Sequence, residues 1–309
     1  MNKIWTTVTI IVLILVFIGY MIFDLVLRKD TVQNIVQETG DSVISDQWIV
    51  ERVFDCGKGK LKAVAVSEDG KIILAGESFI ACYDPELNLL WETKTDSEVT
   101  AIACSSDKIY AARINAITVL NLGGIVIAEW GPYDEKTLIT SVSANKDLIA
   151  FADAAGKSVY ILDSGGEVRS IIGRSGEPFV IPSPYFDVAL GKDNTLFVAN
   201  TGNRRIERRK TDGTLIDYFG EAGLAPDSFC GCCNPAHFAL YGDGFITAEK
   251  GVNRIKILDR NGEFIEFVSS VNSFHAPIPL DIAVSPKGET IFGANPGDSK
   301  LYTFKRKQL

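Results

Sequence analysis

A turn that recurs at nearly regular intervals is the feature that most constrains how this chain can fold. Each copy follows a short run in which apolar and polar residues alternate, which is the pattern of a half-buried β-strand. Successive turns are separated by 38, 40, 46, 50 and 44 residues. This spacing is typical of architectures that repeat a four-stranded β-sheet. The six turns lie at Asp69, Asp107, Asp147, Asp193, Asp243 and Lys287.

The strands around these turns align in columns. The first strand of each unit is a short run rich in small or apolar residues, such as Ala63–Val66 and Asp187–Leu190. The second strand ends in alanine and one further residue, as in Ala199 and Asn200. A third and a fourth strand follow, separated in one unit by a turn at Gly123. Six such units predict an all-β fold, a six-bladed β-propeller.

The sixth unit offers only three strands before Leu309. A run with the character of the other fourth strands, Trp48–Phe54, precedes the first unit. Pairing this run with the third strand of the sixth unit, near Leu301–Phe304, would remove the open edge of the sheet. We therefore predict that the propeller occupies residues 48–309 and is closed by its N-terminal strand.

Units four and five share a motif. Asn203-Arg204-Arg205-Ile206 and Asn253-Arg254-Ile255 follow their second strands, and a glycine turn precedes each fourth strand. This motif resembles the NHL repeat, and the first three units are similar to more degenerate, quinoprotein-type blades. The resemblance extends from about Trp48 and implies a six-bladed propeller, but it implies little about function because propellers host many activities. The matching segments are Pro184–Ala189, Asn194–Ile206, Gly213, Phe219–Gly220, Asn253–Ile255 and Asn261–Gly262.

The N-terminal residues differ from everything that follows. The run Ile4–Phe23 is almost wholly apolar and uncharged, and its 20 residues would span ~30 Å as a helix, the thickness of a bilayer core. Trp5 and Tyr20 lie near its ends, as interfacial aromatic residues do. No small-residue cleavage site follows the run, which favours an uncleaved anchor over a signal peptide. We predict one transmembrane helix within residues 1–28 and a polar tether over residues 29–47.

Charge bears on partners and location. The net charge of −8 argues against nucleic acid as a partner, since phosphate contacts need a basic face. Lys3 precedes the apolar run and Arg28 and Lys29 follow it, so the positive-inside rule decides weakly. We expect a single-pass membrane protein with the propeller outside the cytoplasm, on the periplasmic or extracellular side of a bacterial inner membrane.

One stretch departs from the NHL pattern. In that pattern a phenylalanine and a proline are separated by a few ordinary residues, whereas here Phe229 and Pro235 bracket Cys-Gly-Cys-Cys-Asn. The segment holds Cys230, Cys232 and Cys233, half of the six cysteines in the chain. Because the scaffold does not need this sequence, the segment is a candidate functional site.

Blade topology predicts what lies near these cysteines. The loop from a fourth strand to the next first strand shares a face with the loop from strand two to strand three, and we call this the upper face. The first residues of the inner strands open onto it beside the axis, which brings Asp187, His237 and Asp281 together from three adjacent blades. A purely structural role, in which each aspartate bonds nearby backbone amides, stays open. The residues expected to flank the mouth are Asn200, Glu249 and Asn295.

The cysteines allow three interpretations. Cys232 and Cys233 could form a vicinal disulfide. Three thiolates with His237 or an aspartate could hold a metal ion or an iron–sulfur cluster, which use such ligands. The loop could also form a structural disulfide with Cys56, which is expected on the same face. A location outside the cytoplasm favours oxidation. The cofactor stays open at this point, with calcium the least favoured.

Two classes of function follow. In the first, a membrane-anchored propeller binds another protein, a redox partner, or a metal or redox centre through the cysteine loop. In the second, the chain is a metal-dependent hydrolase of the lactonase kind, with a divalent ion held by oxygen ligands at the mouth. The amidating lyases of the NHL type need several zinc histidines, and this chain has two histidines in all. Because no nucleophile elbow, P-loop or dinucleotide motif is present, binding is favoured over catalysis.

Overall fold

The computed structural model describes residues 10–21, 47–174, 177–251, 254–269 and 278–307. The chain separates into two compact units, Met1–Ile44 and Ser45–Leu309. In the first unit, residues 10–21 form an α-helix whose side chains are exposed and nearly all apolar. Among the described residues, no helix has the length and apolar character needed to cross a bilayer. The two ends of the predicted anchor and nearly all of the tether lie outside the described residues.

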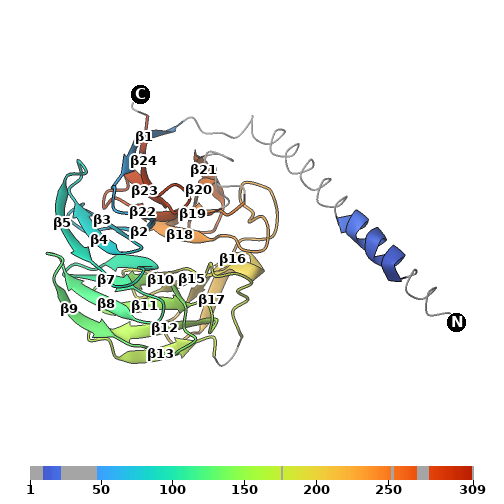
Figure 1. Cartoon of the computed structure of the whole chain (residues 1–309), viewed down its shortest axis with the longest axis horizontal. Coiled ribbons are helices and arrows are strands. Elements are labelled where there is room, and N and C mark those ends of the chain that lie inside the picture. The colour runs from blue at the N-terminus through green and yellow to red at the C-terminus, as the bar shows by residue number, and fades with distance from the viewer. Residues whose placement is uncertain (1–9, 22–46, 175–176, 252–253, 270–277, 308–309) are drawn as a thin grey trace. The chain divides into compact units, whose positions relative to one another are not determined.

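The second unit is the propeller predicted from the repeat. Over the part of the chain that the structure describes, it consists of six four-stranded sheets, and Figure 1 shows them arranged around a common centre. Blades 1 to 5 each use four consecutive strands, with every pair of neighbours antiparallel. Blade 1 contains β2 (Leu61–Val66), β3 (Ile72–Gly76), β4 (Phe79–Tyr83) and β5 (Leu89–Lys94); blade 2 contains β6 (Ala101–Cys104), β7 (Lys108–Ala112), β8 (Ile117–Asn121) and β9 (Val126–Trp130); blade 3 contains β10 (Ile139–Ala144), β11 (Leu148–Asp153), β12 (Ser158–Asp163) and β13 (Val168–Ile172).

The last two complete blades carry the repeats that resemble NHL units. A short 3-10 helix, Thr201–Asn203, joins the second and third strands of blade 4. Blade 4 contains β14 (Val188–Leu190), β15 (Leu196–Asn200), β16 (Arg205–Arg209) and β17 (Leu215–Phe219); blade 5 contains β18 (His237–Tyr241), β19 (Gly244–Ala248), β20 (Ile255–Leu258) and β21 (Phe264–Ser269).

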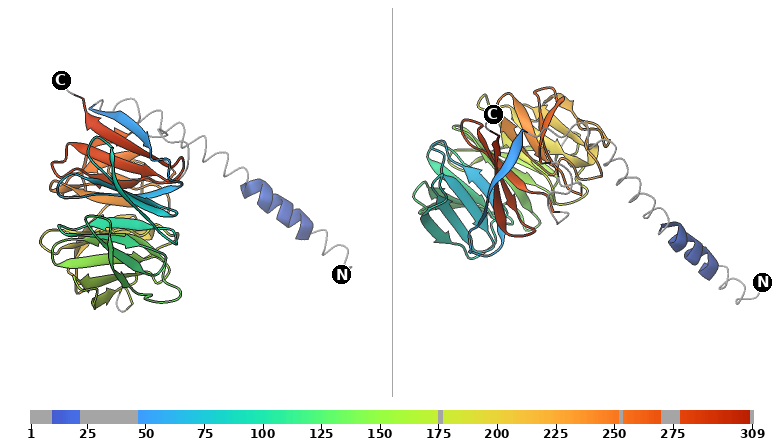
Figure 2. Two further views of the ribbon diagram at one scale, coloured as in Figure 1. Left: turned by 60° about the vertical axis from the view of Figure 1, so that its left-hand side comes forward. Right: turned by 90° about the horizontal axis from the view of Figure 1, so that it is seen from above.

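Blade 6 is completed from the other end of the chain. It contains β22 (Asp281–Val284), β23 (Thr290–Asn295) and β24 (Lys300–Arg306), and its outer strand is β1 (Trp48–Asp55). The strands β1 and β24 are antiparallel, with Trp48 opposite Arg306 and Asp55 opposite Lys300. Figures 1 and 2 show the first strand lying beside the last one. The predicted closure by an N-terminal strand is confirmed.

The blades pack through apolar side chains that fill the spaces between neighbours. The six buried clusters each combine residues of two adjacent blades, so the core is a ring of interfaces and not one central mass. Turn glycines tighten this packing. Gly124 has a φ of +81°, and a Cβ there would lie 2.5 Å from the ring of Trp91 in blade 1. Gly262 repeats the arrangement against Phe219 of blade 4. Only glycine combines this backbone conformation with such a close approach.

Candidate functional site

The first strands of all six blades surround a central cavity of about 830 Å³. The lining includes small residues of the first strands, among them Ala103, Ser143, Ala189 and Ala239. Polar side chains gather where the inner strands begin, which is the upper face. Asp187, His237 and Asp281 all line the cavity at this end.

Equivalent positions near the upper end of the inner strands have a structural task in three of the blades. Oγ of Ser141 accepts a hydrogen bond from the amide of Val188 in the next blade, at 3.2 Å. Oδ2 of Asp187 accepts one from the amide of Phe238, at 2.8 Å. Oδ2 of Asp281 accepts one from Val64 at 2.8 Å, across the junction between blades 6 and 1. These bonds join adjacent blades beside the axis, so the structural role left open for both aspartates is real.

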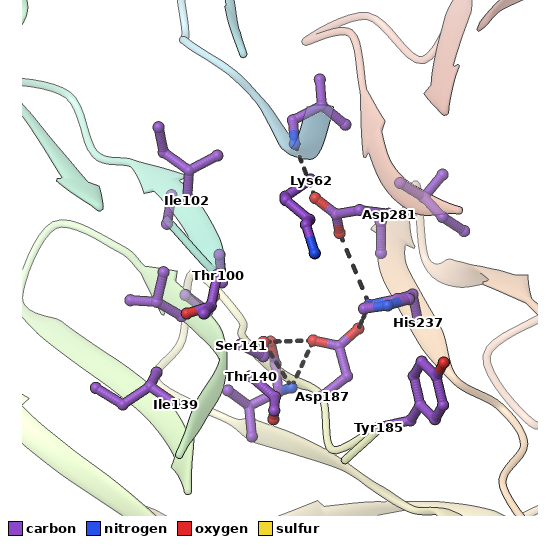
Figure 3. A pocket seen from close by; sticks show the side chains of 18 of the residues that line it. Lys62, Thr100, Ile102, Ile139, Thr140, Ser141, Tyr185, Asp187, His237 and Asp281 are labelled. Carbon is purple, nitrogen blue, oxygen red and sulfur yellow. Dashed lines mark hydrogen bonds and ion pairs between the residues drawn. The ribbon is translucent and has the colours of Figure 1, made fainter. Parts of the chain in front are cut away.

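His237 occupies the same position in blade 5 but makes different contacts. Its Nδ1 lies 3.6 Å from Oδ2 of Asp187 and 3.8 Å from Oδ1 of Asp281. Figure 3 shows the two carboxylates approaching the imidazole from the blades on either side. The hydroxyl of Ser141 donates a hydrogen bond to the other oxygen of Asp187. The imidazole therefore lies between two carboxylates that backbone and side-chain donors hold in place.

Burial and neighbouring charges shift the pKa values of Asp281 and His237. Burial raises the pKa of Asp281 to about 6, although the nearby imidazole and the amide of Val64 favour its charged form. Burial alone would lower the pKa of His237, but its interaction as a donor to the Asp187 carboxylate and the charges of both carboxylates outweigh this effect, and the pKa is raised. The cluster can therefore gain or lose a proton close to neutral pH.

Aromatic and charged side chains complete the mouth of the cavity. The ring of Tyr185 meets the ring of His237 edge to face, with the centroids 6.3 Å apart. Nζ of Lys250 lies 4.7 Å from the centre of the Tyr185 ring. On the opposite side Lys62 pairs with Glu98, at 2.6 Å from Nζ to Oε1. Tyr185 and Lys62 both line the cavity.

Several of these lining residues escaped the sequence analysis. Tyr185 was visible only as part of the repeat motif, because nothing in the spacing distinguishes an aromatic residue that faces the axis from one in the core. Lys62 lies next to a recognised strand start, and Cys104 ends an inner strand and lines the cavity.

The cysteine loop is held rigidly between blades 4 and 5. The ring of Phe229 is fully buried under the ammonium of Lys256, 4.4 Å from the ring centre. Nδ2 of Asn234 donates to the carbonyl oxygens of Cys230, at 2.7 Å, and Lys250, at 3.0 Å. Oδ1 of Asn234 accepts the amide of Lys250 at 2.7 Å. The two ends of the loop are thus fixed to the blade.

The structure does not gather the cysteines and His237 into one site. Cys230, Cys232 and Cys233 are not among the residues that line the cavity, whereas His237 is. Across the described residues, no group of three or more His, Cys, Asp or Glu side chains is arranged to hold a metal ion. The loop is held by contacts with blades 4 and 5, whereas the imidazole of His237 lines the cavity.

All six cysteines are free in this structure. Cys56 packs at the junction of blades 6 and 1, whereas the cysteine loop joins blades 4 and 5. Cys232 and Cys233 have their sulfurs 3.2 Å apart without a bond. The second histidine of the chain, His275, lies outside the described residues.

The residues expected to flank the mouth lie elsewhere. Asn200, Glu249 and Asn295 are buried and are not among the residues that line the cavity. Each lies at or directly after the last residue of a second strand. There the side chain accepts a hydrogen bond from a loop amide or pairs with a basic side chain. Oδ1 of Asn200 accepts the amide of Val180, and Oδ1 of Asn295 accepts the amide of Gly297.

Glu249 lies at the centre of a buried ion network. Its Oε1 is 2.6 Å from Nε of Arg254 and 3.0 Å from Nζ of Lys256. Burial lowers the pKa of Lys256 to about 8, against the attraction of Glu249. Lys256 and Arg254 also donate to the carbonyl oxygen of Ser228, at 2.7 and 3.1 Å. The network supports the segment that leads into the cysteine loop. Both oxygens of the Glu249 carboxylate already interact with basic side chains of blade 5.

Comparison with solved structures agrees with this architecture. A streptogramin B lyase superimposes with a TM-score of 0.63 at 15% identity, covering 84% of this chain and 98% of that chain. Virginiamycin B lyase from Staphylococcus aureus gives 0.58 at 16% identity, over 84% and 99% of the two chains. A structure of the mitotic checkpoint complex gives 0.60 at 10% identity, over 84% and 95%.

The likeness extends to the fold alone. At these identities the chain shares the propeller architecture with an enzyme and with a component of a protein assembly, which fits the range of activities that propellers carry. Comparison of the sequence with known protein families and with curated proteins gives no match. The NHL resemblance therefore has no independent support, whereas the six-bladed propeller does.

Proposed function

We propose that this protein binds a small molecule, or a side chain of a partner, at the upper end of its central cavity, with His237 as the principal contact. The observation that carries the proposal is the position of the imidazole, with Nδ1 against two carboxylates in the lining of a cavity of about 830 Å³. Carboxylates on Nδ1 fix the orientation of the ring, which makes Nε2 the nitrogen available to a ligand.

The charges of the lining indicate the class of ligand. With His237 protonated, Lys60, Lys62 and His237 balance the three carboxylates of Glu98, Asp187 and Asp281. The walls add apolar surface from residues such as Ile102 and Ile139, which Figure 3 shows on the far side from His237. An uncharged, partly apolar compound with a hydrogen-bonding group suits these surroundings, since such cavities combine apolar walls with few polar contacts.

The two histidines of the chain make this proposal directly testable. A chain labelled with nitrogen-15 in histidine alone gives imidazole signals from His237 and His275, and a His275→Gln variant assigns them. Uncharged compounds of low molecular mass are screened for those that shift the His237 signal. We expect hits that also raise the melting temperature of the protein.

A matched variant decides whether the hits act at the proposed site. In His237→Gln, which keeps a polar side chain of similar length, binding of each hit should weaken at least tenfold, or about 1.4 kcal/mol. Binding that is unchanged in this variant, or a screen that never moves the His237 signal, would contradict the proposal.

A second function, proton-transfer catalysis on the bound ligand, is favoured by the same cluster. The raised pKa values of Asp281 and His237 suit an acid–base pair near neutral pH. Among the similar solved structures is a catalytically inactive histidine-to-alanine variant of virginiamycin B lyase, with quinupristin, at 15% identity and a TM-score of 0.57. Each hit is incubated with the protein and analysed by mass spectrometry. Conversion that needs His237 would establish an enzyme, and recovery of every hit unchanged would leave binding as the function.

We also propose that the apolar N-terminal segment anchors the propeller to a membrane. The helix over residues 10–21 supports this, because its exposed side chains are those that a bilayer core accepts, among them Leu13, Leu15 and Phe17. The 20-residue apolar run of the sequence supports it further.

A further inference from the structure

Two adjacent cysteines lie on the upper face with their sulfur atoms in contact. Sγ of Cys232 is 3.2 Å from Sγ of Cys233, although both thiols are free. Cys232 is exposed to solvent, whereas Cys233 is buried. One thiol is therefore accessible to a reagent. The distance between the two sulfurs exceeds the length of a disulfide bond by only about 1 Å.

The surrounding contacts hold this pair in place from both sides. Before it, Nε of Arg204 donates to the carbonyl oxygen of Gly231, at 2.6 Å. After it, the Asn234 side chain bonds to the backbone of Cys230 and of Lys250. The loop is thus built around the pair, and the contact between the sulfurs does not depend on a freely moving segment.

We propose that Cys232 and Cys233 form a two-electron thiol–disulfide site that reacts with small-molecule disulfides. Cys232 is the attacking cysteine, because it is the accessible one, and Cys233 is the resolving cysteine. The site is separate from the cavity that His237 lines, and the proposal does not depend on the function proposed for that cavity.

The exchange takes place in two steps. The thiolate of Cys232, having lost its proton to water, attacks one sulfur of an external disulfide, whose S–S bond breaks and releases one thiolate. The thiolate of Cys233 then attacks Sγ of Cys232, which forms the bond between the two cysteines and releases the second thiolate. The cysteines together lose two protons and two electrons, and the external disulfide becomes two thiols.

Sequence adjacency makes the oxidised state reversible. Most disulfides join residues whose Cα atoms are 4.4–6.8 Å apart, whereas neighbouring residues across a trans peptide are ~3.8 Å apart. A disulfide between neighbours is consequently strained, and strained disulfides are the more easily reduced ones. The site should cycle with the thiol–disulfide balance around it and should not act as a permanent crosslink.

The third cysteine of the loop is not part of this site. Burial raises the pKa of Cys230 to about 11, with the charge of Glu249 adding to the effect. Its sulfur accepts a long hydrogen bond of 3.5 Å from Nδ2 of Asn234. Because the thiolate is the reactive form, Cys230 serves as the internal control.

The test uses the full chain, reduced and purified without oxygen, and then exposed to oxidised glutathione. The pH is mildly alkaline, because contact with Cys233 raises the pKa of the Cys232 thiol. Trypsin releases residues 211–250, a fragment that contains only these three cysteines. We expect the wild-type fragment to lose two hydrogen atoms and to carry no glutathione. Reduced dithiothreitol should restore its mass.

Three single variants identify the bond. Cys230→Ser should still lose two hydrogens, at a rate within twofold of the wild type. Cys233→Ser should instead accumulate one glutathione on Cys232, because the resolving thiol is missing. Cys232→Ser should react at least tenfold more slowly. The proposal is overturned if the wild-type fragment keeps its glutathione, if it never reacts, or if Cys230→Ser abolishes the loss of hydrogens.

Discussion

His237 differs from Ser141, Asp187 and Asp281 because, within the described residues, its side chain accepts no hydrogen bond from a backbone amide of the next blade. Ser141, Asp187 and Asp281 each use the equivalent position to accept an amide hydrogen bond from the next blade. His237 instead faces the two aspartates that frame it. The side chain of His237 therefore does not serve this joining role, and the neighbouring aspartates flank it at the cavity wall.

This cluster should make the stability of the fold depend on pH. The pKa of Asp281 is about 6 in the folded chain, above its ordinary value of 3.8, and that of His237 is raised above 6.5. The native state therefore binds more protons than the unfolded chain, and stability falls as pH rises through these values. For Asp281 the loss between about pH 4 and pH 7 is at most ~3 kcal/mol.

Asp281→Asn tests this, since the amide oxygen can still accept the hydrogen bond from Val64. The variant should lack most of the fall in unfolding free energy between pH 4 and pH 7, measured by chemical denaturation with circular dichroism. Asp147→Asn, at an exposed turn, serves as the control and should retain the wild-type profile. Identical profiles for all three proteins would show that Asp281 is not protonated within this range.

The sequence predicted the place of a side chain where its position along an inner strand was enough to determine it. The start of the inner strand and its alternation placed Asp187, His237 and Asp281 at the axis. Asn200 and Glu249 were placed by another signal, the end of a second strand. That position shares the face with the inner-strand starts, but the repeat does not encode its distance from the axis, and neither residue lines the cavity. The contact of Tyr185 with His237 depends on the path of a loop, which periodicity does not describe.

At the level of strands, the sequence is a close guide. The predicted strand Ala63–Val66 lies within the observed β2, the predicted Asp187–Leu190 differs from β14 by one residue, and His237 begins β18 as expected. Alternation and glycine turns determine these limits locally, so no tertiary information was needed. The closure of the ring was also predictable. The sixth unit lacked a fourth strand, and the run Trp48–Phe54 was a strand without a sheet of its own, so pairing the two satisfies both.

The closing strand should matter for stability. Deleting residues 1–55 removes β1, exposes the edge of β24, and removes Trp48, whose buried ring lies under the guanidinium of Arg306. Loss of this buried tryptophan alone costs ~3–5 kcal/mol. We expect a much lower melting temperature, or no cooperative transition, by differential scanning calorimetry. Deletion of residues 1–44 is the matched control and should melt as the full propeller does; equal melting of the two truncated chains would refute this expectation.

For the molecule as a whole, the N-terminal segment predicts membrane attachment. The full chain should sediment with bacterial membranes and resist extraction by carbonate, whereas a chain lacking residues 1–44 should not.

A membrane-impermeant thiol reagent should label Cys232 in intact spheroplasts, because its side chain is exposed. Recovery of the full chain in the soluble fraction would remove the anchor, and labelling only after lysis would place the propeller inside the cytoplasm.

The pairing of β1 with β24 also sets an order of events during synthesis. Blades 1 to 5 can each assemble from four strands that leave the ribosome in succession, whereas β1 emerges before all of them and must wait for β24. Until then the ring is open and the edge of β1 is unpaired, with apolar side chains at Ile49, Val50 and Val53 exposed even in the finished fold. A nascent chain in this state is open to chaperones and proteases. The ring can therefore close only after β24 has been synthesised. A product that stops before residues 300–306 would keep an open ring and an unpaired β1.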